Sequence, residues 1–401
     1  MNQESRSLPV LVAGGGIGGL AAALAVARTG VPVKVLEQAP QMGEIGAGIQ
    51  LGPNAFTAFD ALGVGERARG RAVYTDEMVM HDALDETLVG RIPTGKAFRE
   101  RFGNPYAVIH RADVHASLLE GVRELGTAVE LRTSSCVQRV EQGDEGVVVF
   151  DTNGERHPGL ALIGADGVRS AVRRQYVGDD ARISGHVVYR AVVDRKDFPA
   201  DLQWNAASIW VGPNCHLVHY PLRGGEQYNV VVTFHSRDQE EWSVREGSRN
   251  EVQSYFEGIC PRARQLIDLP KSWKRWATAD REPIGQWTYG RATLLGDAAH
   301  PMLQYLAQGA CMALEDAVTL GAALQAHPGN FARAFARYER SRIARTARVV
   351  LSAREMGRIY HAKGVERLVR NDLWRGRTPE RFYDALAWLY GWNVGNCLAA
   401  N

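Results

Sequence analysis

Cysteine is scarce in this chain and shows no metal-binding pattern. The 401 residues include five cysteines, an odd number, and no two of them are separated by only two residues. A structural zinc site needs closely spaced cysteine or histidine pairs, and a disulfide framework needs an even set. We therefore expect a reduced, cytoplasmic protein without a structural metal ion.

Long apolar runs and an excess of one charge are also missing. No stretch approaches the roughly 18 apolar residues that a membrane span needs, and the first residues lack the apolar core of a signal peptide. Lysine and arginine number 47, against 45 aspartates and glutamates. We therefore expect no integral membrane association and no nucleic-acid partner, because nucleic-acid-binding proteins usually carry a basic excess.

Glycine, in contrast, is concentrated in one motif near the start, GGGIGG at residues 14–19. An apolar run at residues 9–13 predicts a buried strand before the motif, and residues 20–29 predict a helix after it. A second predicted strand, residues 31–36, ends at Glu37. This order of strand, glycines, helix, strand and acid is typical of a dinucleotide-binding unit.

Each glycine in the motif has a physical reason. Gly14 permits the tight turn, Gly16 lets a pyrophosphate approach the backbone, and Gly19 lets the helix pack closely on the strand. The helix N-terminus offers free N–H groups to phosphates, and Glu37 can accept hydrogen bonds from ribose hydroxyls. An acid at this position disfavours a 2′-phosphate, and thus NADP, at this site.

Two further motifs follow predicted strands later in the chain. ADG at residues 165–167 follows an apolar run at 160–163, and GDAAH at 296–300 follows one at 292–295. A helix is predicted to begin near Gly309. An aspartate placed after such a strand can bind a ribityl hydroxyl, while the N-terminus of the next helix faces a pyrophosphate.

The three motifs, in this order over nearly the whole length, resemble the class A flavoprotein aromatic hydroxylases, the family of para-hydroxybenzoate and salicylate hydroxylases. The resemblance implies FAD, reduction of FAD by NADH, and a flavin hydroperoxide that transfers oxygen to a phenolic aromatic acid. It also implies the following cofactor-binding residues: Gly14, Gly16, Ile17, Gly19, Glu37, Gly48, Arg111, Asp166, Asp297, Gly309 and Ala310.

The loop after GDAAH departs from the usual family sequence. Gln304 stands in place of a proline, Ala307 in place of a glycine and Cys311 in place of an asparagine. HPMLQYL at 300–306, together with WLYGW at 388–392, resembles the branch that converts 3-hydroxybenzoate to 2,5-dihydroxybenzoate (gentisate). Three alternatives stay open: a decarboxylating salicylate or 6-hydroxynicotinate hydroxylase, a flavin-dependent dehydrogenase or reductase, and a non-catalytic nucleotide-binding protein that acts as a ligand sensor.

Short β-type runs between residues 173 and 281 predict an antiparallel sheet that forms one wall of a substrate pocket. Strand alternation at residues 216–220 places His216 and Tyr220 on one face and His219 on the other. His216 is our candidate for the base that deprotonates a phenol, and Tyr220 for a proton relay. Gln304 is a candidate hydrogen-bonding partner of the substrate.

For each of these three residues a structural role is the alternative. His216 and Tyr220 would then be a half-buried polar pair on a solvated sheet face, and Gln304 would satisfy loop backbone. We interpret His300 as a structural loop histidine and Cys311 as an inert helix residue.

The fold class is therefore α/β, a Rossmann-like FAD-binding domain with an inserted antiparallel substrate domain and a helical C-terminal region. We place the FAD domain at residues 1–70, 101–175 and 285–330, the substrate domain at 71–100 and 176–284, and the helical region at 331–401. A basic stripe in the helical region, expected to be a solvated face or dimer contact, contains Arg333, Arg337, Arg340, Arg345 and Arg348. We expect a homodimer with an aromatic acid and dioxygen as small-molecule partners.

Overall fold

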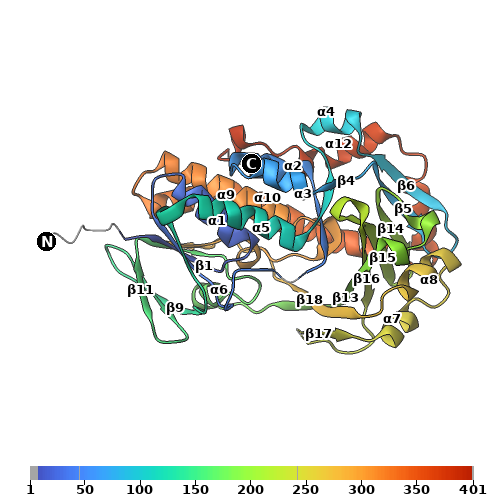
Figure 1. Cartoon of the computed structure of the whole chain (residues 1–401), viewed down its shortest axis with the longest axis horizontal. Coiled ribbons are helices and arrows are strands. Elements are labelled where there is room, and N and C mark those ends of the chain that lie inside the picture. Colours follow the sequence, from blue (N-terminus) through green and yellow to red (C-terminus); the bar gives the residue numbers. More distant parts are fainter. Residues whose placement is uncertain (1–7, 45, 242, 400–401) are drawn as a thin grey trace.

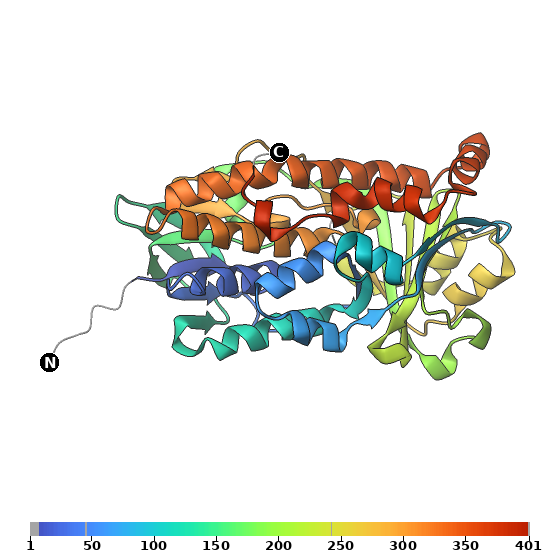
Figure 2. The same cartoon turned by 90° about the horizontal axis from the view of Figure 1, so that it is seen from above.

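The chain forms two sheet regions that are joined by long helices (Figure 1). The computed structural model describes residues 8–44, 46–241 and 243–399. One region is a parallel sheet covered by helices, and the other is a larger, mostly antiparallel sheet at the opposite end of the molecule (Figures 1 and 2). The predicted α/β class is confirmed.

The parallel sheet has six strands, and its central part is the predicted dinucleotide-binding unit. Strand β1 pairs with β2 and β12 in parallel, and only the edge pair β19–β20 is antiparallel. The central strands are continuous apolar runs because both faces of a parallel sheet are buried. The sheet order is β19 (Thr288–Tyr289), β20 (Ala292–Leu294), β12 (Ala161–Gly164), β1 (Val10–Ala13), β2 (Val33–Leu36) and β8 (Val129–Arg132).

Helix α1 (Ile17–Ala27) follows β1 directly and begins three residues earlier than predicted. The glycines that the sequence analysis assigned to the turn are therefore partly inside the helix. Glycine is needed at residue 19 because the first turn of the helix packs directly on the backbone of Gly14, where a side chain would clash. The chain leaves α1 at Gly30, whose φ of 85° is the left-handed conformation usual at a helix end.

The second large sheet has eight strands and contains the short β-type runs predicted between residues 173 and 281. Its strands pair in antiparallel fashion except for β14 with β5. A hairpin turn joins β15 to β16 through residues 223–225, and Gly224 and Gly225 both have positive φ. The order is β17 (Val244–Gly247), β18 (Trp273–Asp280), β13 (Arg182–Asp194), β16 (Gln227–His235), β15 (Cys215–Leu222), β14 (Ala206–Gly212), β5 (Glu77–Asp82) and β6 (Leu88–Pro93).

One face of this sheet packs on two short helices, α7 (Arg249–Tyr255) and α8 (Pro261–Asp268), around a core that includes Trp210 and Trp273. The sheet takes its strands from residues 77–93 and 182–280. The division of the chain into domains at the boundaries given above stays a prediction.

Two small sheets complete the strands. One has the strand order β3–β7–β4, and its β7 lies near β15 of the eight-stranded sheet. Its strands are β3 (Gly48–Leu51), β7 (Ala107–His110) and β4 (Val73–Tyr74). The other contains β11 (Arg156–Gly159), β10 (Val147–Asp151) and β9 (Val137–Gln142).

Helix α9 (Gly309–Ala326) is buried along most of its length and packs between α1 and α10 (Phe331–Tyr360). At 30 residues, α10 spans about 45 Å at 1.5 Å per residue, and Figure 2 shows it running from the parallel sheet toward the eight-stranded sheet. None of the helices in the described ranges combines the length and apolar character required to cross a bilayer.

The remaining helices cover the two sheets and the space between them. They are α2 (Pro53–Ala61), α3 (Gly65–Arg71), α4 (Lys96–Phe102), α5 (Arg111–Glu124), α6 (Ala171–Tyr176), α11 (Gly364–Trp374) and α12 (Pro379–Tyr390).

Candidate active site

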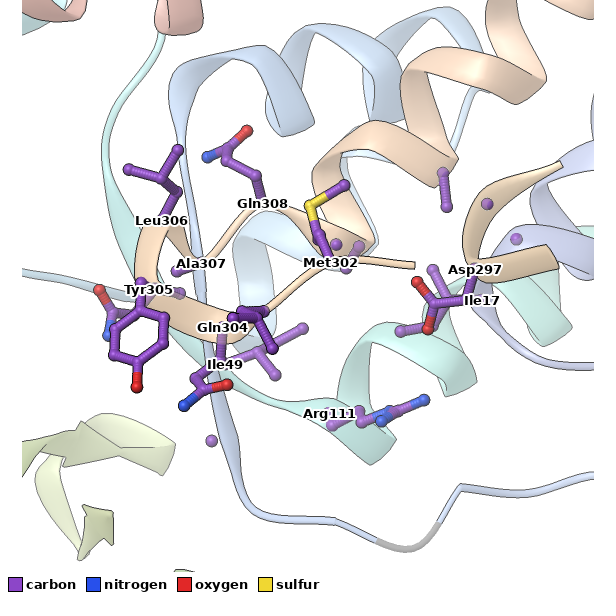
Figure 3. Close-up of a pocket in the computed structure, with 18 of the residues that line it drawn as sticks. Ile17, Ile49, Arg111, Asp297, Met302, Gln304, Tyr305, Leu306, Ala307 and Gln308 are labelled. Atoms are coloured by element: carbon purple, nitrogen blue, oxygen red, sulfur yellow. The ribbon is translucent and has the colours of Figure 1, made fainter. Parts of the chain in front are cut away.

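A cavity of 1110 Å³ connects the glycine motif to the eight-stranded sheet. It is lined by all three predicted catalytic residues and by every predicted cofactor-binding residue except Gly19. Figure 3 shows part of its wall, with Met302 and Gln304 on the segment that leads to α9, Asp297 near Met302, and Arg111 at the start of α5. The fold therefore brings together motifs that lie almost 300 residues apart in the sequence.

The glycine motif forms a turn that no larger residue fits. Gly14 has a φ of 100°, and a Cβ atom there would lie 2.4 Å from the carbonyl oxygen of Ala165. A Cβ on Gly19 would lie 1.9 Å from the carbonyl oxygen of Gly14. Gly19 thus acts through packing, which explains why it does not line the cavity. At Gly16, the nearest atom to an added Cβ is a carboxylate oxygen of Glu44 at 3.4 Å, so this position is less crowded than Gly14 or Gly19.

Glu37 ties the end of β2 to this turn. One carboxylate oxygen accepts a hydrogen bond from the backbone N–H of Gly15 at 2.6 Å, and the other accepts one from Ala39 at 2.7 Å. Each carboxylate oxygen has a second lone pair, so the side chain can still accept from a ligand hydroxyl in the cavity. Glu37 lies at the cavity wall, as its place after the strand predicts.

Asp166 presents an unpaired acceptor. Its Oδ2 accepts hydrogen bonds from the backbone N–H groups of Ala171 and Val172, at 2.8 and 3.3 Å. Its Oδ1 is buried with no hydrogen-bond partner in the described part of the chain. Burial raises the pKa of this carboxyl group, although the hydrogen bonds around it oppose the shift. A buried, unpaired acceptor at a cavity wall indicates a place for a ligand donor.

Asp297 and the first residues of α9 also line the cavity. A Cβ on Gly309 would lie 3.9 Å from Oδ1 of Asp297, so the first residue of α9 is directly beside this carboxylate. No side chain caps the N-terminus of α9 or that of α1. Both helices therefore offer free N–H groups and the positive end of a helix dipole to the cavity.

The eight-stranded sheet presents alternate residues of β15 to the cavity. His216, Val218 and Tyr220 line it, whereas His219 packs on the other face against Phe198 and Trp204. The predicted alternation is confirmed. His216 is only 3 % exposed, and burial together with the nearby His186 lowers its pKa to about 3. The imidazole is therefore uncharged at pH 7 and keeps a free lone pair, but burial makes it a weaker base than a solvated histidine.

Tyr220 lies against Gly48 of β3. A Cβ on Gly48 would be 2.5 Å from a ring carbon of Tyr220, so only glycine permits this approach. The backbone N–H of Gly48 donates to Oδ1 of Asn229 at 2.9 Å, and its carbonyl accepts from Arg190 at 3.4 Å. The sequence analysis missed Arg190 and Asn229. Their positions facing β3 became apparent only when β13, β16 and β3 were placed together.

Gln304 and Tyr305 form a short 3₁₀ turn at the edge of the cavity (Figure 3). The side-chain amide of Gln304 donates to the hydroxyl of Thr233 at 3.5 Å, a long hydrogen bond that leaves its carbonyl oxygen available. The turn ends at Ala307, whose φ of 52° is left-handed. This conformation explains why glycine is usual at this position in the family that the sequence resembles.

Known proteins resemble the chain along its whole length. Residues 7–353 match the model of a family described as FAD binding domain. The chain belongs to this FAD-binding family. It is 76% identical to a 3-hydroxybenzoate 6-hydroxylase of Polaromonas naphthalenivorans, over 100% of both chains, and 60% identical to one of Klebsiella oxytoca, over 99% and 100%.

Among solved structures, HpxO of Klebsiella pneumoniae, complexed with FAD and uric acid, superposes with a TM-score of 0.84. The two chains are 27% identical, and the alignment covers 96% of this chain and 97% of that one. The resemblance to flavoprotein aromatic hydroxylases drawn from the sequence motifs is confirmed.

The cavity fits the FAD of this family. Two uncapped helix N-termini suit a pyrophosphate, Glu37 and the unpaired oxygen of Asp166 suit hydroxyl donors, and a Cβ at Gly14 or Gly19 would have no room. The residues that would hold the cofactor are those of the three motifs. The role of each individual residue in binding FAD stays a prediction.

A buried ionic network supports the third motif of this FAD-binding fold. His300 and Asp316 contact each other at 2.6 Å, and Asp316 also accepts from the backbone N–H of Gly296 and from Arg342. Arg342 donates as well to Glu315 at 2.7 Å. Burial alone would raise the pKa of Asp316, but His300 and Arg342 lower it to about 2. These contacts agree with the structural role predicted for His300.

The sequence analysis did not predict this network, although an acidic pair inside the apolar α9 was a signal for it.

One prediction about α10 was wrong. Arg345 was assigned to an exposed basic stripe, but its side chain is only 9% exposed. Its guanidinium binds both oxygens of Glu315 and the backbone carbonyls of Trp388 and Leu389, and so joins α9, α10 and α12. Cys311 is buried on α9, and burial raises the pKa of its thiol to about 12. The thiol is therefore protonated and unreactive at pH 7, in agreement with the inert role predicted for Cys311.

Proposed function

We propose that this protein is an FAD-dependent monooxygenase that hydroxylates 3-hydroxybenzoate at carbon 6 and releases 2,5-dihydroxybenzoate. The observation that carries the proposal is its 76% identity, over the entire length, to a 3-hydroxybenzoate 6-hydroxylase. The cavity supports it, because the cofactor motifs and a wall of hydrogen-bonding side chains line one continuous space.

Bound FAD supplies the redox and oxygen-activating chemistry, and the protein supplies orientation, a base and exclusion of water. Carbon 6 of 3-hydroxybenzoate is para to the hydroxyl group, and removal of the phenolic proton makes that carbon electron-rich. His216 is the proposed base, since its imidazole is neutral and lines the cavity. An apolar neighbour such as Val218 keeps water away from the ring.

Tyr220 and Gln304 are proposed to hold the substrate. Tyr220 lies on the same face of β15 as His216, and Gln304 lies across from β16, where it reaches Thr233. The free carbonyl oxygen of Gln304 can accept a hydrogen bond from the phenolic hydroxyl, and its amide can donate to a carboxylate. Together they would orient carbon 6 toward the cofactor.

NADH as the reductant, the homodimer and the cytoplasmic location remain predictions that rest on the sequence and on the family resemblance. Comparing turnover with NADH and NADPH tests the first. Light scattering of the purified protein tests the second, and fractionation of cells that express the protein tests the third.

The function is tested by measuring NADH oxidation by the purified flavoprotein with a panel of hydroxybenzoates and identifying each product by mass. We expect 3-hydroxybenzoate to stimulate oxidation and to yield 2,5-dihydroxybenzoate. Stimulation by salicylate alone, with catechol and carbon dioxide formed, would move the protein to the decarboxylating branch. Turnover without consumption of dioxygen would favour a dehydrogenase.

A further inference from the structure

Two buried amide side chains contact each other beside the cavity, and the proposed reaction uses neither of them. They are Asn54 on α2 and Gln308, which directly precedes α9 and lines the cavity (Figure 3). Asn54 is 0% exposed and Gln308 is 2% exposed. Nδ2 of Asn54 donates to Oε1 of Gln308 at 2.9 Å, although 254 residues separate the two in the sequence. The pair therefore joins α2 to the beginning of α9.

Glu315, on α9, fixes the orientation of the Asn54 amide. The same Nδ2 also donates to Oε1 of Glu315, at 2.7 Å. Arg342 and Arg345 donate to the oxygens of this carboxylate as well, so Glu315 acts only as an acceptor. A reversed amide would turn Oδ1 of Asn54 toward the carboxylate, and two acceptors would then face each other. Nδ2 of Asn54 therefore faces α9 and holds both Gln308 and Glu315.

The carbonyl oxygen of Asn54 shows that this orientation has a cost. Oδ1 is buried and has no hydrogen-bond partner within the described residues. A Cβ added to Gly52 would lie only 2.6 Å from it, so the oxygen faces backbone rather than the cavity. An unpaired buried carbonyl is unfavourable, and an apolar side chain of similar shape would avoid it. Asn54 therefore does more than fill space, and what its amide adds is the pair of hydrogen bonds to Gln308 and Glu315.

Gln308 occupies the position at which a helix often carries a capping side chain. A serine, threonine, aspartate or asparagine there would accept hydrogen bonds from the first free N–H groups. The side-chain carbonyl of Gln308 instead accepts from Asn54, and no side chain caps α9. The first N–H groups of α9 thus stay free next to Asp297, whose Oδ1 would lie 3.9 Å from a Cβ on Gly309.

Helix α2 provides a fixed anchor for this contact. Ala55, Phe56, Ala58 and Phe59 of α2 are each 0% exposed and belong to the main hydrophobic core. The helix packs directly against α9. A hydrogen bond from α2 therefore limits the movement of the residue before α9.

We propose that Asn54 is a positioning residue for the cofactor: by anchoring Gln308 to α2, it holds the uncapped first turn of α9 against the flavin half of bound FAD. The flavin half is assigned because α9 begins beside Asp297, the residue expected to bind the ribityl chain. The adenosine half is expected at the glycine motif and Glu37. The inference goes beyond the proposed function, since it concerns the cofactor and holds for any aromatic substrate.

The first test titrates the full-length apoprotein with FAD and, separately, with AMP, which carries only the adenosine half and one phosphate. In Asn54→Ala and in Gln308→Met we expect the Kd for FAD to rise on the order of 10-fold, as for one or two misplaced hydrogen bonds. The Kd for AMP should be nearly unchanged. Equal losses for FAD and AMP would show a general structural role and would overturn the proposal, as would wild-type FAD affinity in both variants.

Thr57→Val is the matched control on the same helix. The hydroxyl of Thr57 donates to the carbonyl of Pro53 at 3.2 Å and accepts from Asn104 at 3.1 Å, so it holds α2 without reaching α9. We expect this variant to lose some thermal stability and to bind FAD as the wild type does. FAD affinity lowered as much as in Asn54→Ala would mean that any disturbance of α2 has this effect, and would overturn the specific role of Asn54.

The double variant, Asn54→Ala with Gln308→Met, tests whether Asn54 acts through Gln308. We expect its Kd for FAD to match that of Asn54→Ala, because the same contact is lost in both. Effects that multiply would show two independent roles and contradict the proposal.

Should Asn54→Ala not fold, Gln308→Met decides the matter, since methionine adapts to a buried site and leaves the bond between Asn54 and Glu315 in place. None of these titrations uses an aromatic substrate or measures turnover. A failure of this inference therefore leaves the proposed hydroxylation untouched, and a wild-type protein that forms no dihydroxybenzoate leaves the inference standing.

Discussion

Single residues set the chemistry of the cavity, and His216 has the central place among them. It is a neutral, buried imidazole on the cavity face of β15 and is hydrogen-bonded to a second histidine. Its neighbour His219 is equally buried but points to the opposite face. The two residues therefore form a natural pair for separating catalysis from packing.

Replacing His216 with alanine should slow hydroxylation by about 10²- to 10⁴-fold, the usual range for loss of a general base, and should leave FAD bound. Single-turnover product formation and the flavin absorbance of the purified variant measure the two effects. His219→Ala serves as the control, with lower stability but hydroxylation retained. Full coupled turnover in His216→Ala would show that His216 is structural.

Asp297 is the residue whose loss should act on the cofactor. Its carboxylate lies at the cavity wall beside the first residue of α9, and the residue is exposed, outside the packed core. We expect Asp297→Ala to weaken FAD retention by on the order of tenfold or more, since a charge-assisted hydrogen bond contributes about 1.5–3 kcal/mol. The dissociation constant for FAD of the apoprotein measures it. An Asp297→Asn variant tests whether charge or hydrogen bonding matters, and wild-type affinity in both variants would contradict the assignment.

At the scale of elements, the packing of α9 against α10 depends on a buried ionic network. Arg342, 1% exposed, binds Asp316 and Glu315, and Arg345 binds Glu315 and the end of α12. Buried ion pairs are not in themselves strongly stabilising, but removal of one partner leaves an uncompensated charge. The network also holds the backbone of Gly296, which precedes Asp297.

Arg342→Met should therefore lower the free energy of unfolding by about 3–5 kcal/mol. Arg340→Met is the matched control, because Arg340 is an exposed residue of the same helix and its replacement should change stability by less than about 0.5 kcal/mol. Urea unfolding of the two variants measures the difference. Equal midpoints would show that the network does not hold α9 on α10.

The elements themselves could largely be predicted, but their partners could not. Period-two alternation identified the cavity face of β15, and the apolar run before the glycines identified β1. His361 lies 145 residues from His216 and Asp316 lies 26 residues from Arg342, so no local pattern links either pair. For Arg345, helical spacing alone predicted exposure, because the acid it meets, Glu315, belongs to another helix.

At the scale of the whole molecule, buried neutral histidines make stability depend on pH. His219 has no hydrogen-bond partner for either ring nitrogen within the described part of the chain, and burial lowers its pKa to about 3. In the unfolded chain its pKa is about 6.5, so below that pH the unfolded state binds the proton more readily. Stability is therefore highest above pH 6.5 and falls as the pH drops toward 3.

We expect protonation linked to His219 alone to lower the free energy of unfolding by up to about 3 kcal/mol as the pH falls from 6.5 to 4. The expected slope is about 1.4 kcal/mol per pH unit. His219→Phe, which fits among the aromatic rings around this position, should lose correspondingly less stability over the same range. Urea unfolding at several pH values measures the slopes. Parallel pH profiles for the variant and the wild type would mean that His219 is protonated or solvated in the folded protein.

The measurement that tests the central claim most directly is incorporation of oxygen-18 from dioxygen into the product formed from 3-hydroxybenzoate, NADH and the purified flavoprotein. The account predicts 2,5-dihydroxybenzoate with one labelled oxygen, at the carbon para to the original hydroxyl group. Unlabelled product, a label at another ring position, or NADH oxidation without any dihydroxybenzoate would contradict it.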